Sequence, residues 1–199
     1  MAARLNTRLI LLLIIGVGFI GAGCGAYVLF VLSKDATKHV VQGREFMEKG
    51  DYRRARYQFA RAVAKDETNL EYVDLLEEAL TSIKPEAISE ARELVQVYSS
   101  LLGHRAAHHP HVAEFHLRAL REVSQAARRL NSGGHWRLVD RLAEDMLASL
   151  PQTDEAYPEG YYYLAASRLS PLRRSDVSDR EVTEAEEDLA TYLEERPES

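Results

Sequence analysis

The feature that most constrains the fold of this chain is residues 43–69, where two short amphipathic segments flank a tight turn. Gly50 and Asp51 interrupt the apolar pattern, which then returns at spacings of three and four residues, as one face of a helix requires. The returning positions are Tyr52, Ala55, Phe59, Ala62 and Val63. Small residues such as Gly43 let two helix backbones approach closely, while larger side chains fill the space between them. The stretch therefore predicts a tight helical hairpin.

The spacing of these residues resembles the tetratricopeptide repeat, a helix-turn-helix unit of about 34 residues. The matching positions are Gly43 and Phe46 in the first helix, Gly50 and Tyr52 at the turn, and Ala55, Phe59 and Ala62 in the second helix. The chain departs from the family pattern at His39 and Gln42, which replace Trp and Leu, and at Glu67, which replaces the closing Pro. The resemblance implies an α-solenoid whose first helices line a concave binding surface.

Apolar positions at helical spacing continue almost to the end of the sequence, and strand-like alternation is missing, so we expect residues 35–199 to be all-α. The predicted helices beyond the first hairpin cover residues 70–83, 85–102, 110–130, 136–150, 157–169 and 179–195, with loops at 103–109, 131–134 and 170–178. The second clear match to the family pattern is formed by Ala127, Leu130, Gly134, Trp136 and Pro151. The expected fold is a solenoid of about four helical hairpins, two of them degenerate.

The predicted helix that follows Lys84 carries a continuous apolar stripe. Pro85 stands at its first position, where a proline is tolerated. The stripe consists of Ala87, Ile88, Ala91, Leu94, Val95, Tyr98, Leu101 and Leu102. This helix completes the second expected hairpin.

Residues 9–32 contain no charged side chain. As a helix they would be about 36 Å long, enough to cross a hydrocarbon core of about 30 Å. We therefore expect residues 1–34 to be a single transmembrane anchor that holds residues 35–199 beside the membrane. A cleaved signal peptide and a lipoprotein signal are the alternatives. Residues 21–24 resemble a lipidation box ending in Cys24, but apolar residues continue beyond this cysteine.

Glycines in the apolar run suggest self-association. Gly21 and Gly25 have the small-x-x-x-small spacing that permits close helix pairing in lipid, although glycine is frequent in membrane helices generally. Arg4 and Arg8 precede the run and favour a repeat domain on the non-cytoplasmic side. The expected localisation is a single-pass membrane protein.

Composition and motifs argue against several classes of function. The net charge of −6 lacks the basic footprint of a nucleic-acid-binding protein. Phosphate-binding glycine loops and nucleophile motifs are missing from the sequence, so we expect no enzyme activity and no cofactor. Five histidines gather between His104 and His116. A metal-handling protein is the alternative that they raise, against the interpretation of a polar loop followed by a helix start.

The charge pattern points to a partner-binding groove. Residues 105–137 contain six arginines and only two glutamates, whereas residues 176–198 are strongly acidic. One face of the predicted helix 110–130 carries Arg121, Ser124 and Arg128, followed by Asn131, and the corresponding face of the first repeat carries Arg44. The resemblance implies that peptides dock on such faces, and arginine suits acidic ones.

The function that these features predict is a membrane-anchored scaffold that binds other proteins or peptides and assembles a complex. The alternative is a non-catalytic N-terminal part of a larger membrane enzyme or of a secretion or assembly machine. Ala190 and Leu193 lie beside the main stripe of the last predicted helix. We therefore expect the array to continue beyond Ser199, since each solenoid repeat covers only its neighbours.

Overall fold

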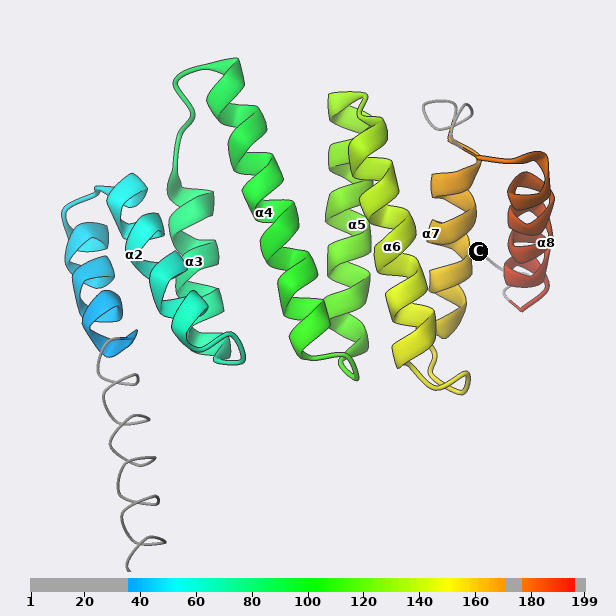
Figure 1. The fold of residues 1–199 in the computed structure, drawn as a ribbon, viewed down its shortest axis with the longest axis horizontal. Helices are drawn as coiled ribbons and strands as arrows, with labels where there is room; N and C mark the ends of the chain where they lie inside the picture. Colours follow the sequence, from blue (N-terminus) through cyan, green and yellow to red (C-terminus); the bar gives the residue numbers. More distant parts are fainter. Residues whose placement is uncertain (1–35, 171–176, 196–199) are drawn as a thin grey trace, which may run out of the picture. The chain divides into compact units, whose positions relative to one another are not determined.

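The computed structural model describes residues 36–170 and 177–195, and within them the chain forms eight helices and no strand (Figure 1). The first helix covers residues 36–48 and has no label in the figure. The others are α2 (Tyr52–Lys65), α3 (Leu70–Ser82), α4 (Ile88–His108), α5 (Ala113–Leu130), α6 (Gly133–Ser149), α7 (Tyr157–Arg168) and α8 (Asp179–Glu195). The all-α prediction is confirmed for this part of the chain.

The predicted membrane run, with Gly21, Cys24 and Gly25, lies outside the described residues. Among the residues that are described, no helix is both long enough and apolar enough to span a membrane. The chain divides into two compact units, Met1–Ala79 and Leu80–Ser199.

The first unit contains the helical hairpin predicted from residues 43–69. Gly50 has a φ of 71°, which supplies the left-handed turn position. The side chain of Asp51 then caps α2 by accepting a hydrogen bond from the N–H of Arg54 at 3.1 Å. Ala55 and Phe59 are fully buried, as their spacing predicted. The hairpin is thus specified locally, by its turn, its cap and its apolar face.

Close contact between the two helices of this hairpin depends on Gly43. A Cβ atom built on this glycine would lie 2.7 Å from Cδ1 of Phe59, so only glycine lets the Phe59 ring occupy this position. A hydrogen bond of 2.8 Å between His39 and Gln58 joins the same two helices. The predicted role of Gly43 as a small contact residue is confirmed.

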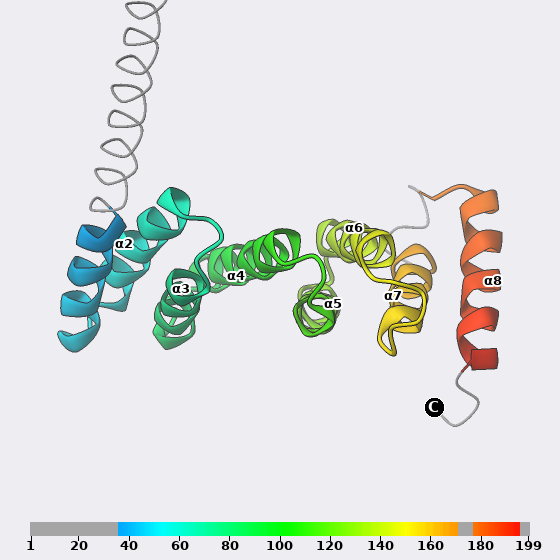
Figure 2. The same cartoon turned by 90° about the horizontal axis from the view of Figure 1, so that it is seen from below.

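In the second unit, each helix from α4 to α8 packs against the next one in the chain. α5 also contacts α7, and Figure 2 shows these two helices in one layer with α4 and α6 in the other. The core contains Leu120, Val123, Trp136, Val139 and Met146, all buried. This two-layer order of sequential neighbours is repeat-like helical packing.

Several helix ends differ from the prediction. The expected loop at residues 103–109 is helical up to His108, because the buried face of α4 continues past Gly103 through Arg105 and Ala106. α4 begins at Ile88 rather than Pro85, and α5 at Ala113 rather than Pro110. Packing of an uninterrupted face outweighs the local cost of one glycine inside a helix.

The turn between α5 and α6 is also built differently from the prediction. Asn131, not a glycine, holds the left-handed position, with a φ of 49°. Ser132 caps α6 through its side chain, so that Gly133 and Gly134 fall inside the helix. Asn tolerates the left-handed region, and Ser is a better N-cap than Gly, which explains the shift.

Candidate functional site

The residues predicted to form a binding face on α5 do not all lie on one exposed surface. Arg121 and Arg128 are exposed, but Ser124 is only 5% exposed and its hydroxyl donates to the carbonyl oxygen of Arg121 at 2.9 Å. The prediction is therefore wrong for Ser124, which lies on the buried side together with Val123 and Ala127. A small side chain that bonds to its own helix backbone fits such a packed position.

Asn131 is exposed, but its backbone ends α5. Its N–H donates to the carbonyl oxygen of Arg128 at 3.3 Å, and the N–H of Ser132 reaches that of Ala127 at 3.1 Å. These bonds satisfy carbonyl groups that a helix otherwise leaves without partners at its C-terminus. Asn131 thus has a structural role that the sequence interpretation did not assign to it.

Arg121 links the two helices that share a layer in the second unit. Its guanidinium hydrogen-bonds to the hydroxyl of Tyr163 on α7. Burial raises the pKa of Tyr163, and the nearby carboxylate of Glu159 raises it further, whereas Arg121 lowers it. The phenol therefore stays protonated at neutral pH, and the exposed arginine is positioned by a neutral hydroxyl group on α7.

Arg44 makes a comparable link within the first unit. Its guanidinium forms an ion pair of 2.8 Å with Glu71, so the helix at residues 36–48 is joined to α3. In both units an arginine joins helices that are separated by one helix in the chain. The two sites differ in charge, because Glu71 neutralises Arg44. Both side chains of this pair are more than half exposed, so the pair contributes little to stability.

Two further arginines on α5 contact aromatic rings. The guanidinium carbon of Arg128 lies 5.9 Å from the ring centroid of Trp136. Nη2 of Arg118 donates to the hydroxyl of Tyr98 on α4 at 3.3 Å. Stacking and hydrogen bonding to these aromatic side chains orient both guanidinium groups.

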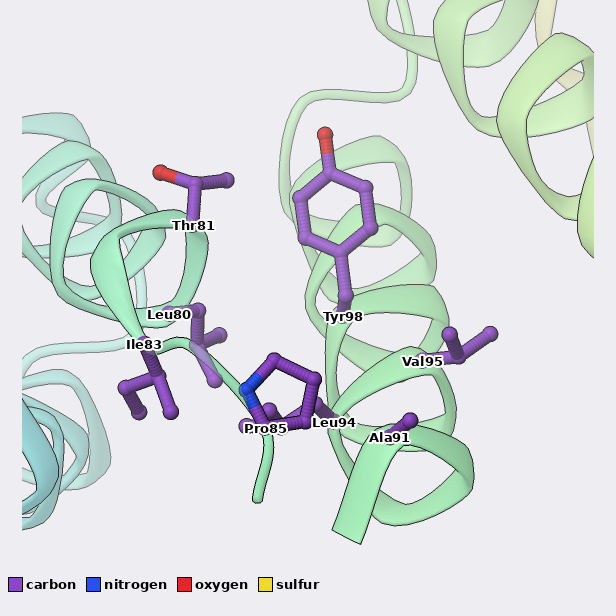
Figure 3. Close-up of a pocket in the computed structure, with 8 residues that line it drawn as sticks. All are labelled: Leu80, Thr81, Ile83, Pro85, Ala91, Leu94, Val95 and Tyr98. Atoms are coloured by element: carbon purple, nitrogen blue, oxygen red, sulfur yellow. The ribbon is translucent and has the colours of Figure 1, made fainter. Parts of the chain in front are cut away.

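A second feature of the same unit is an apolar pocket of about 250 Å³ between the last turn of α3, the linker that follows it, and the first half of α4 (Figure 3). Its lining consists of Leu80, Thr81, Ile83, Pro85, Ala91, Leu94, Val95 and Tyr98. Leu80 and Ile83 are buried, whereas Leu94, Val95 and Tyr98 remain partly exposed. Part of the apolar stripe found in the sequence is therefore open to solvent.

The histidines gather around the α4–α5 connection. The rings of His104 and His108 lie 4.0 Å apart between centroids, and Nε2 of His116 lies 3.0 Å from the carbonyl oxygen of Pro110. His116 is almost fully buried. Within the described part of the chain, no three His, Cys, Asp or Glu side chains are grouped closely enough to hold a metal ion. These contacts give His116 a structural role, closing the turn before α5.

A polar pocket of about 350 Å³ lies between α4 and the start of α6. Ser132 and His135 line it, with Oγ of Ser132 at 3.0 Å from Nδ1 of His135. Burial lowers the pKa of His135, which favours the neutral imidazole. The Ser132 oxygen also accepts the backbone N–H of His135 at 3.4 Å, the geometry of a helix N-cap. The contacts between Ser132 and His135 are therefore part of the N-terminal cap of α6.

The sequence interpretation missed two features of this unit. Tyr163, the partner of Arg121, lies in a run of three tyrosines that carried no periodic signal. The pocket could have been suspected, because the stripe on α4 has more apolar positions than one neighbouring helix can cover. No model of a known protein family matches the chain, and a search of curated proteins finds no match either.

Proposed function

We propose that this chain is a membrane-anchored scaffold resembling the tetratricopeptide repeat proteins, which binds segments of other proteins and assembles a complex at the membrane. Residues 9–32 anchor it, with Gly21 and Gly25 supporting self-association, and the helical part lies on the non-cytoplasmic side. The repeat-like order of the helices and the hairpin at Gly43 and Phe59 support the resemblance.

The observation that carries this proposal is the set of exposed arginines on α5. Arg121 is held by the neutral Tyr163 and Arg128 lies beside Trp136, so both side chains are positioned without losing their charge. Positioned guanidinium groups bind carboxylates through two parallel hydrogen bonds, and less side-chain entropy is lost when they are held in advance. The partners that suit this surface are acidic protein segments.

The test is cross-linking of the full chain in its native membrane, followed by identification of the cross-linked proteins. Replacing Arg121 and Arg128 together by Gln should remove a set of partners that the unaltered chain captures. Arg129→Gln is the matched control, because this exposed arginine of α5 already donates to Gln125 of its own helix. The same partners captured by all three chains would contradict the proposal.

A further inference from the structure

The polar pocket between α4 and the start of α6 lies within the second unit, and the proposed function does not use it. Its lining consists of Gln96 and Ser99 from α4, and of Ser132, Gly134, His135 and Leu138 from the cap and first turns of α6. Its volume of about 350 Å³ falls within the range of ordinary small-molecule sites, which is about 300–1,000 Å³. The lining is mainly polar, so the pocket suits a small polar ligand.

Ser99 is the residue that points most directly to a ligand. It is only 3% exposed, yet among the residues that the structure describes none forms a hydrogen bond with its hydroxyl group. A buried hydroxyl without a partner costs about 1–3 kcal/mol, and most buried polar groups in proteins are paired. Because Ser99 lines the pocket, a ligand bound there would supply the missing partner.

The first turn of α6 supplies further hydrogen-bond donors. The first N–H groups of a helix have no acceptor within it. Here the side chain of Ser132 takes the N–H of His135, and its carbonyl oxygen takes that of Trp136 at 3.3 Å. The N–H groups of Gly133 and Gly134 receive no acceptor from the part of the chain that the structure describes. They lie at the positive end of the helix dipole, which favours a negatively charged ligand.

His135 and Gln96 complete a set of neutral donors. Burial lowers the pKa of His135, so its imidazole is uncharged at neutral pH. Its Nδ1 lies 3.0 Å from the hydroxyl oxygen of Ser132, and when this hydroxyl donates the bond, the ring proton is on Nε2. Gln96 adds a side-chain amide from α4. These groups can donate hydrogen bonds to an anion from two helices at once.

We infer that this pocket binds a phosphate group, either as inorganic phosphate or as part of a small phosphate ester. The phosphate oxygens accept hydrogen bonds from the hydroxyl of Ser99, the N–H of Gly134 and the imidazole of His135. A tetrahedral anion suits donors on two helices because its oxygens point in several directions, whereas the two oxygens of a carboxylate lie in one plane. The inference goes beyond the proposed function, since the ligand is a small molecule and the site lies on α4 and α6.

The experiment is isothermal titration calorimetry of the full chain in a maltoside detergent, with inorganic phosphate and glycerol phosphate as ligands. Sodium chloride at equal ionic strength provides the background. Both ligands should bind saturably at one site per chain, and the tighter of the two shows whether the free ion or an ester is preferred. Ser99→Ala should weaken binding at least about tenfold, because a hydrogen bond to a charged group is lost.

Gly134→Ala should also weaken binding. A Cβ at this position would meet Oγ of Ser132 at an ordinary 3.7 Å, so the fold admits the methyl group while the pocket loses space. The matched control is Ser100→Ala, which removes an exposed hydroxyl from the same helix and should leave binding unchanged. Circular dichroism confirms that each variant is folded before it is used.

The inference is overturned if neither ligand binds, if acetate binds as tightly as phosphate, or if Ser99→Ala and Ser100→Ala bind phosphate equally well. Phosphate should still bind after Arg121 and Arg128 are replaced by Gln, which separates this site from the proposed arginine surface. Loss of binding in that double variant would assign the phosphate to the arginines of α5 and would overturn the inference as well.

Discussion

At the scale of single residues, the first hairpin depends on the absence of a side chain at Gly43. Gly43 is buried against the ring of Phe59, which is itself fully buried. Dense packing of this kind makes an additional methyl group costly, because the neighbouring backbone or ring must move to admit it. The same chain contains a helical glycine in a very different environment, which allows the effect to be isolated.

We expect Gly43→Ala to destabilise the protein by about 1–3 kcal/mol, since the new methyl group would overlap the Phe59 ring. Gly103→Ala is the control: its new Cβ would meet only Leu142, at an ordinary 3.6 Å. Removing a glycine from the interior of α4 should stabilise by about 0.5–1 kcal/mol. Thermal melts followed by circular dichroism measure both, and equal shifts for the two variants would contradict the packing described for Gly43.

Asp188 on α8 gives a prediction about pH. Burial raises the pKa of its carboxyl, and Glu184 and Glu187 raise it further, against the opposing effect of Arg168. A raised pKa means that the folded state binds this proton more readily than the unfolded state, so stability falls as pH rises through the shifted range. At neutral pH the charged form is therefore a net cost to folding.

Asp188→Asn should thus raise the melting temperature at neutral pH, and the gain should vanish in acid, where the carboxyl is protonated in both states. Glu186→Gln, on the exposed side of the same helix, is the control and should have little effect. Melting temperatures of the three chains across a pH series provide the measurement. A gain that persists in acid would show that burial of the Asp188 charge is not the cause.

At the scale of the helices, local sequence signals predicted the elements well where a turn contained both a left-handed residue and a helix-capping residue. Gly50 and Asp51 supplied both a left-handed turn and a cap, and the hairpin around them was predicted correctly. Gly103 was misread as a loop because its tolerance in α4 depends on buried neighbours far away in the sequence. Prediction of the Ser124 face failed for a similar reason, since a serine fits both an exposed and a packed position.

The turn after α5 shows which part of the predicted site is structural. Asn131 has a positive φ, so a β-branched residue would be strained there while glycine would not. We expect Asn131→Gly to preserve the stability of the protein. Asn131→Val should lower the free energy of unfolding by at least about 1 kcal/mol. If Asn131→Gly folds normally but loses partner capture, the side chain also has a binding role. Equal stability of the two variants would instead contradict the left-handed conformation.

At the scale of the whole molecule, sequential packing makes stability a property of neighbouring helices. In the second unit α6 packs against both α5 and α7, and its residues Val139 and Met146 are fully buried. α8 packs against α7, with Ala185 and Tyr192 buried but Leu193 51% exposed. The sequence could predict this order because each stripe pairs with the next. The surplus of apolar positions on α4 was the one sequence signal for the pocket, but the lining contributed by the linker after α3 carried no such signal.

This packing order predicts a gradient of local opening. Backbone amides of α6 should exchange with solvent more slowly than those of α8, because α8 can separate from α7 without disturbing the core around Trp136 and Met146. Met146→Ala should cost about 2–5 kcal/mol and speed exchange throughout α5, α6 and α7. Tyr192→Ala, which removes a contact between α8 and Tyr162, should speed exchange in α8 alone. Hydrogen exchange followed by mass spectrometry on the full chain distinguishes these outcomes. Protection of α8 equal to that of α6, or acceleration in α6 caused by Tyr192→Ala, would show that the unit opens as one block.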